Sequence, residues 1–124
     1  MKKAIVLVAG IAALVGSLLV ASASAHTQAK AATKVTVTMT DFHFKITIPK
    51  GQVIKHGVFV TFKVVNKGGA VHNFDLQQVK ASKIIAPGKT TTIKVKFKKK
   101  GKFPYVCDVP RHAELGMAGT LKVA

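Results

Sequence analysis

The sequence predicts an all-β domain, an antiparallel sandwich or barrel of about eight short strands. Apolar and polar residues alternate with a period of two over most of the chain, which is typical of strands that bury one face. Turn sequences rich in glycine, proline and asparagine recur at intervals of about ten residues. After residue 25, no segment has a helical period longer than a single turn, so helices are not expected in the domain.

The segment 1–25 has the composition of a signal peptide. Two lysines precede a long apolar run, Ala4–Ala21, and Ala23-Ser24-Ala25 forms an A-x-A cleavage pattern. A bilayer-spanning helix needs about 20 residues, so the run is almost long enough to anchor the protein. We expect cleavage after Ala25 and export to the periplasm or the extracellular space. An uncleaved leader that attaches the protein to a membrane is the alternative.

The rest of the chain divides into a short lead-in and one domain. Residues 26–33 are small and polar, which predicts a flexible segment before a domain over residues 34–124. The expected strands of this domain cover residues 35–40, 42–48, 58–64, 71–76, 79–85, 93–97, 103–107 and 119–123. Pro104 removes a hydrogen-bond donor from its strand and predicts an edge or a bulge. The lysine-rich run at 96–102 predicts a charged hairpin tip.

Basic residues greatly outnumber acidic ones, 20 against four. The leader holds two of the basic residues and no acidic one, so the remaining chain has a formal charge of +14. Such an excess favours contact with an anionic partner: lipid headgroups, a cell-wall polymer, nucleic acid or an acidic protein. Export argues against nucleic acid. The lysines also alternate with apolar residues along the strands, so simple solvation of the strand faces explains them equally well.

The single cysteine, Cys107, excludes an internal disulfide. A lone cysteine in an exported protein indicates a dimer contact, a buried thiol or a metal ligand. His112 and Met117 follow it at equal steps, in the loop expected between the last two strands. Sulfur ligands with imidazole favour copper, and two histidines, one cysteine and a weak axial methionine form a known copper site. Zinc fits less well, because it gains little from a thioether.

This copper site requires a second histidine, and strand alternation selects it from four candidates. His43 falls on the polar face of its strand, His56 lies in a lysine-containing turn, and His26 would begin the cleaved chain. His72 follows a glycine turn in GGAVHNFDL and has apolar neighbours, so a strand end can bring it to the last loop. We therefore select His72.

The segments GGAVHNFDL and YVCDVPRHAELGMAGTLKV resemble the cupredoxins, the plastocyanin-like family of small blue copper proteins. The resemblance covers about Val35–Val123 and implies an eight-stranded Greek-key sandwich with one copper ion at one end. It implies four ligands, His72, Cys107, His112 and Met117, and a supporting Asn73 that ties the two ligand loops together. Four residues separate the cysteine from the following histidine, whereas plastocyanins have two, so the spacing is closer to that of rusticyanin-like members.

The resemblance also implies a function. A one-electron carrier would exchange electrons through a partly exposed His112, surrounded by an apolar docking patch. The patch would consist of Val109, Pro110, Ala113 and Leu115. We expect a monomer whose partners are redox proteins with acidic docking surfaces, and an anionic membrane or cell-wall surface is a further candidate partner.

Two other functions are consistent with parts of the sequence. A copper storage or delivery protein could bind the ion through the amino terminus and imidazole of His26 after cleavage, without Cys107. An oxidase or reductase would need His-x-His ligand pairs and further copper domains, or a second cysteine for a binuclear centre, and these are absent from the sequence. No acid/base pair or Ser/His/Asp pattern appears either, so we do not expect an enzyme.

Overall fold

The computed structural model describes residues 10, 22 and 27–124. The expected cleavage site and His26 lie outside the described residues. The described part is an all-β domain with ten strands, and it contains no helix long and apolar enough to cross a membrane. The strands are β1 (Lys30–Ala31), β2 (Lys34–Thr40), β3 (His43–Thr47), β4 (Gln52–Val53), β5 (Phe59–Asn66), β6 (Asp75–Leu76), β7 (Lys80–Ala81), β8 (Thr90–Lys96), β9 (Gly101–Val106) and β10 (Ala118–Val123).

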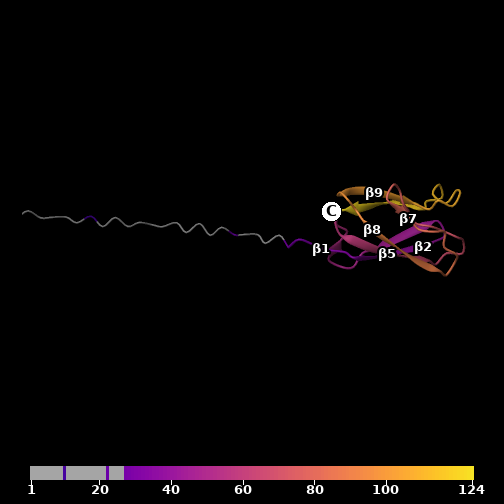
Figure 1. Ribbon diagram of the computed structural model, residues 1–124, viewed down its shortest axis with the longest axis horizontal. Helices are drawn as coiled ribbons and strands as arrows, with labels where there is room; N and C mark the ends of the chain where they lie inside the picture. The colour runs from indigo at the N-terminus through magenta and orange to yellow at the C-terminus, as the bar shows by residue number, and fades with distance from the viewer. Residues whose placement is uncertain (1–9, 11–21, 23–26) are drawn as a thin grey trace, which may run out of the picture.

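Two four-stranded sheets form the two layers of a sandwich (Figure 1). One sheet has the order β3-β2-β5-β8 and the other the order β10-β9-β6-β7, while β1 and β4 form a small parallel pair. The predicted β-sandwich is therefore confirmed. Four of the ten strands, β1, β4, β6 and β7, have only two residues.

The alternation in the sequence places one face of each long strand in the core. Val60, Phe62 and Val64 of β5 are all fully buried, and the residues between them face outward. Phe62 lies against Phe74 from the other sheet, with ring centroids 5.8 Å apart. Burying one such side chain stabilises the fold by about 1.5–3 kcal/mol. Within the described residues, every strand and core residue lies between residues 30 and 124, so we expect residues 27–124 to fold as one domain.

One pair of long strands differs from the expected antiparallel arrangement. β2 and β5 are parallel, with Val37 opposite Val64. The cause is the path of the chain. β3 runs back beside β2, so Thr47 lies opposite Thr36, near the start of β2. The connection after Thr47 stays near the start of β2 until β5 begins. β5 therefore leaves from the same end of the sheet as β2 does, and runs in the same direction.

The boundary between β2 and β3 changes the register of the apolar face. Apolar residues occupy odd positions up to Met39 and even positions from Phe42 onward. A turn at Asp41 and Phe42 produces this change. Phe42, which the alternation placed with Phe44, has a φ of 64° and a 39 % exposed side chain. The assignment of Phe42 to a strand is therefore wrong.

The lysine-rich run at 96–102 is not a hairpin tip. β8 pairs with β5 in one sheet, whereas β9 pairs with β10 and β6 in the other. The run is a crossover between the two layers. Phe97 fixes it, because its ring is buried and packs on Phe62 and Phe103 at centroid distances of 6.4 and 4.8 Å.

Pro104 lies in β9, where β10 flanks one side and the short β6 the other. Its carbonyl accepts a hydrogen bond from the amide of Gln77, the first residue beyond β6. In an antiparallel strand the N–H and C=O of one residue point to the same side. The donor that proline lacks would therefore face the region where β6 has ended, so the ladder within β6 remains complete.

Candidate metal centre

His72 lies between β5 and β6 and is completely buried. Its backbone exchanges two hydrogen bonds with Ile85, at 3.2 and 2.8 Å, so it lies in an isolated bridge. Cys107 is the first residue after β9 and is 2 % exposed. His112 and Met117 belong to the loop that continues from Cys107 to β10. Two distant parts of the chain therefore meet at one end of the sandwich.

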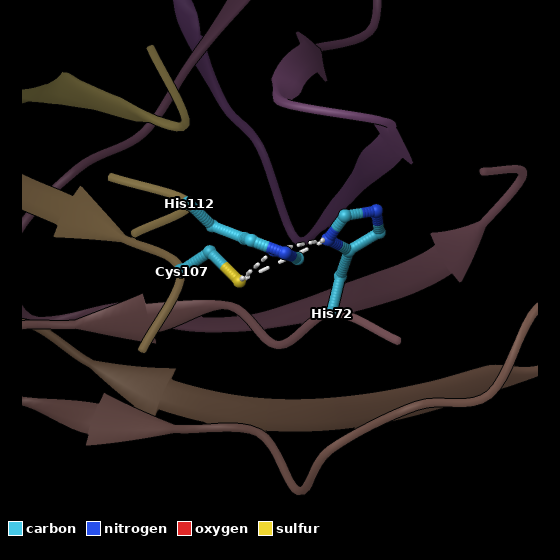
Figure 2. A group of neighbouring side chains, drawn as sticks. All are labelled: His72, Cys107 and His112. Atoms are coloured by element: carbon cyan, nitrogen blue, oxygen red, sulfur yellow. Dashed lines mark hydrogen bonds between the residues drawn. The ribbon is translucent and has the colours of Figure 1, made fainter. Parts of the chain in front are cut away.

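Three potential ligand atoms converge at this point (Figure 2). The Nδ1 atoms of His72 and His112 are 3.1 Å apart, and the Sγ of Cys107 lies 3.9 Å from the first and 3.6 Å from the second. A trigonal ion about 2.1 Å from each ligand atom would hold such atoms about 3.6 Å from one another. The size of the triangle therefore fits one metal ion.

Asp41 fixes the ring of His72 from the side opposite the triangle. The Nε2 of His72 donates to Oδ1 of Asp41 at 3.0 Å, so in the neutral imidazole Nδ1 carries no proton and is free to bind a metal. Asp41 itself accepts hydrogen bonds from the amides of Gly69 and Ala70, each at 3.0 Å. The amide of Gly69, the bond from His72 and the amide of Ala70 lower the pKa of Asp41, so the residue is a carboxylate at neutral pH.

Gly68 leaves room for this carboxylate–imidazole pair. A Cβ atom at position 68 would lie 2.4 Å from Oδ1 of Asp41 and 3.0 Å from Nε2 of His72. Any side chain there would displace one of the two groups. The glycine turn that precedes His72 in the sequence is therefore required by close packing at the site.

The residue after Asp41 supports the other histidine. The ring of Phe42 meets the ring of His112 edge-on, at a centroid distance of 5.1 Å and an interplanar angle of 87°. The turn between β2 and β3 thus contacts both imidazoles. The positive φ of Phe42 is uncommon for an aromatic residue, and the contact with His112 is made in this conformation.

Asn73 and Asp108 join the two ligand-bearing segments. The side-chain amide of Asn73 donates to Oδ2 of Asp108 at 2.7 Å, and the amide of Asp108 donates to Oδ1 of Asn73 at the same distance. Each residue directly follows a candidate ligand, His72 and Cys107 respectively. The pair therefore holds the spacing between the two segments.

Backbone hydrogen bonds close the loop that follows Cys107. The amide of Cys107 donates to the carbonyl of Met117, and the amide of Met117 donates to the carbonyl of His112, both at 3.0 Å. Gly116, with a φ of 109°, makes the turn before Met117 in a conformation that favours glycine. The Met117 side chain is fully buried.

The residues selected for partner docking lie in this same loop. Pro110 and Ala113 are exposed and Leu115 is 58 % exposed, whereas Val109 is half-buried and packs against the core. The other histidines within the described residues do not join the triangle. His43 is exposed, and His56 contacts the carbonyl of Ala124 through Nδ1 at 2.9 Å.

The sequence matches the family described as a cupredoxin-like domain over residues 10–121, almost the whole chain. The chain belongs to this family. No curated protein matches this cupredoxin. Its fold is similar to that of the reduced auracyanin from the photosynthetic bacterium Roseiflexus castenholzii, with a TM-score of 0.64 and 20 % sequence identity, covering 76 % of this chain and 98 % of that one.

Two other solved structures extend the comparison. The periplasmic domain of subunit II of cytochrome oxidase (CoxB) of Bradyrhizobium japonicum gives a TM-score of 0.62 at 16 % identity, over 77 % of this cupredoxin and 86 % of that chain. A multicopper oxidase from Campylobacter jejuni, a metallo-oxidase, gives 0.57 at 18 % identity, over 73 % of this chain and 29 % of that one. At these identities the likeness concerns the fold alone.

Two residues that contact the candidate ligands, Asp41 and Phe42, were not selected from the sequence. The change from odd to even apolar positions between Met39 and Phe42 marks a turn at this place. It does not show that the turn reaches His72, which lies 31 positions further along the chain. Only the parallel pairing of β2 with β5 brings the end of β2 to the segment after β5.

Proposed function

We propose that this cupredoxin binds one copper ion and carries single electrons between redox proteins outside the cytoplasm. His72, Cys107 and His112 would hold the ion, with Met117 as a weak axial ligand. The observation that carries the proposal is the buried triangle of two imidazole nitrogens and one thiol sulfur. This set of donors favours copper over zinc, because a structural zinc site requires four strong ligands.

The residues around the triangle hold the donors in place. Bound copper supplies one-electron chemistry by alternating between Cu(II) and Cu(I). Asp41 fixes the His72 ring, Phe42 packs on His112, and the Asn73–Asp108 pair sets the distance between the two segments. Because these contacts are built on a rigid sandwich, the donors need to move little when the charge of the site changes. Small movement favours fast electron transfer.

His112 offers the route for the electron. It is the one candidate ligand of the triangle that is partly exposed, since the other two are buried. The exposed Leu115, with Pro110 and Ala113, provides an apolar surface beside it. Redox proteins meet through small and transient interfaces, and a patch of a few residues is sufficient for them. The high net positive charge favours partners with acidic docking surfaces.

A carrier without catalytic activity is favoured over an oxidase. The chain corresponds to 98 % of the auracyanin but to only 29 % of the Campylobacter jejuni oxidase. Residues 27–124 contain a single group of three or more His, Cys, Asp or Glu side chains able to hold a metal ion, and it consists of His72, Cys107 and His112. The signal-peptide pattern of the segment 1–25 supports a location outside the cytoplasm.

Copper titration of the purified chain that begins at His26 tests this function. We expect one copper ion per chain, an intense visible thiolate-to-copper band, and complete, reversible reduction by one electron. The measurements are absorption, paramagnetic resonance and voltammetry. Copper binding without the visible band, or binding that depends on His26, would favour a storage or delivery protein.

A substitution at Asp41 tests the support of His72. Asp41→Asn keeps the size of the side chain but removes the charge that holds the imidazole. Loss of such a supporting contact lowers metal affinity by about 10–100-fold, and we expect a decrease in this range in competition with a chelator. Glu114→Gln removes one negative charge from an exposed position in the ligand loop and is the matched control. Equal decreases in both variants would show that only the general charge matters.

A further inference from the structure

The acidic residues of the chain all lie at the end of the sandwich that holds the metal centre. They are Asp41, Asp75, Asp108 and Glu114. Asp41 contacts a candidate ligand, Asp75 pairs with Val106 at the end of β9, and the other two belong to the ligand loop. This end of the molecule therefore carries mixed charge.

The opposite end carries lysines without any acidic residue. We define the basic end as Lys55, Lys98, Lys99, Lys100, Lys102 and Lys122, of which all but Lys55 are exposed. Lys100 lines one hollow together with Lys55, and a second hollow of about 390 Å³ together with Lys102 and Lys122. Ala124, with the terminal carboxylate, lines both hollows. Within residues 27–124, however, the only carboxylate–cation pair involves His72, so none of these lysines forms an ion pair.

Two of these lysines face each other across a pair of strands. Lys102 of β9 lies directly opposite Lys122 of β10 in the register. Like charges at directly opposite positions destabilise a sheet. Solvation of the strand faces does not require such a pair, because a lysine opposite a threonine would also give a polar surface. A nearby anionic surface would offset the repulsion between the two lysines.

The distance from the metal centre argues against a redox partner at this end. β9 runs from the lysine-rich crossover at Gly101 to Val106, beside Cys107. Its six residues span roughly 20 Å at about 3.3 Å each, and Figure 1 shows the ligand loop and the C-terminus at opposite ends of the sandwich. A protein bound at the basic end would be too far from His112 for direct electron exchange.

The start of the described chain indicates which anionic surface is involved. Gln28 and Ala29 line the same hollow as Lys55 and Lys100. The sequence that precedes them contains the apolar run Ala4–Ala21, whose composition is suited to a membrane. The described chain therefore begins at the basic end, and a leader kept as a membrane anchor would bring this end to the bilayer. We propose that the basic end docks on an anionic lipid bilayer and leaves the metal centre pointing away from it.

Vesicle binding tests the proposal with residues 27–124, which contain every strand and core residue of the described structure. The probe is vesicles of phosphatidylcholine with about one third phosphatidylglycerol, in about 0.1 M salt. The test variant replaces Lys98, Lys99, Lys100 and Lys102 with glutamine. Each lysine near an anionic surface strengthens binding about five-fold, so we expect the four changes to weaken co-sedimentation by several hundred-fold.

A matched variant separates a local surface from total charge. Replacing Lys45, Lys63, Lys67 and Lys89 with glutamine removes the same charge from exposed positions outside the basic end. We expect this variant to lose less than about ten-fold in binding. Equal losses in the two variants would overturn the proposal. Failure of the unchanged domain to bind these vesicles would overturn it too, and would point to an acidic protein or polymer as the partner.

Discussion

Replacing Cys107 with serine is expected to remove the visible band of the copper-loaded protein completely. The substitution changes one atom at a site that is 2 % exposed, so the fold can accommodate it. A serine hydroxyl remains protonated at neutral pH and supplies neither the negative charge nor the soft sulfur that copper favours. The triangle then keeps only its two imidazoles. Absorption and paramagnetic resonance after addition of one equivalent of copper measure the effect.

The control for this experiment is Met117→Leu. Met117 is fully buried, and leucine has a similar volume, so the core is preserved. Because the thiolate remains, we expect this variant to keep its colour while its reduction potential changes. A coloured Cys107→Ser variant would contradict the proposed site, since it would place the copper elsewhere. Colour lost from both variants would contradict a merely axial role for Met117.

Replacing Asn66 with leucine is expected to lower the free energy of unfolding by about 2 kcal/mol or more. Asn66 is completely buried at the end of β5, and its side-chain amide donates to the carbonyls of Ala70 and Ile85, each at 2.8 Å. Its Oδ1 accepts a hydrogen bond from the amide of Gly68 at 2.9 Å. Leucine fills a similar space but leaves the carbonyl of Ala70 and the amide of Gly68 without their partner, at about 1–3 kcal/mol for each group when buried. The carbonyl of Ile85 keeps the hydrogen bond from the amide of His72.

Urea unfolding of the copper-free protein measures this loss without a contribution from metal binding. Lys67→Leu introduces the same side chain at the neighbouring exposed position, and we expect it to change stability by less than about 0.5 kcal/mol. A loss below about 1 kcal/mol for Asn66→Leu would show that the groups around Asn66 find other partners. Asn66 holds the segment between Gly68 and Ala70, so copper affinity is also expected to decrease in this variant.

The alternation of apolar and polar residues was sufficient to predict the sandwich, because this alternation depends on which side chains each strand buries locally. Val60, Phe62 and Val64 are buried as their spacing indicates. Pairing between strands depends on how connections cross the fold, and local patterns do not contain this information. The run at 96–102 has the charge and glycine of a hairpin tip, yet the burial of Phe97 between the layers turns it into a crossover.

The convergence at the metal centre was predictable in part. Three candidate ligands are close in the sequence, and the selection of His72 followed from its glycine turn and apolar neighbours. The structure places His72 within 3.9 Å of the thiol of Cys107. Asp41 escaped selection because no spacing rule connects it to His72. The contact between Asp41 and His72 depends on the parallel pairing of β2 and β5, which the sequence pattern did not reveal.

The backbone bond between Cys107 and Met117 gives the protein a separable module. Residues 108–116 leave and re-enter the scaffold at nearly the same point, and most of them are exposed. Insertions and replacements in such a segment leave the two sheets undisturbed, because few core contacts depend on it. Evolution or protein engineering could therefore exchange this segment as a unit, giving the same β-framework a new recognition surface.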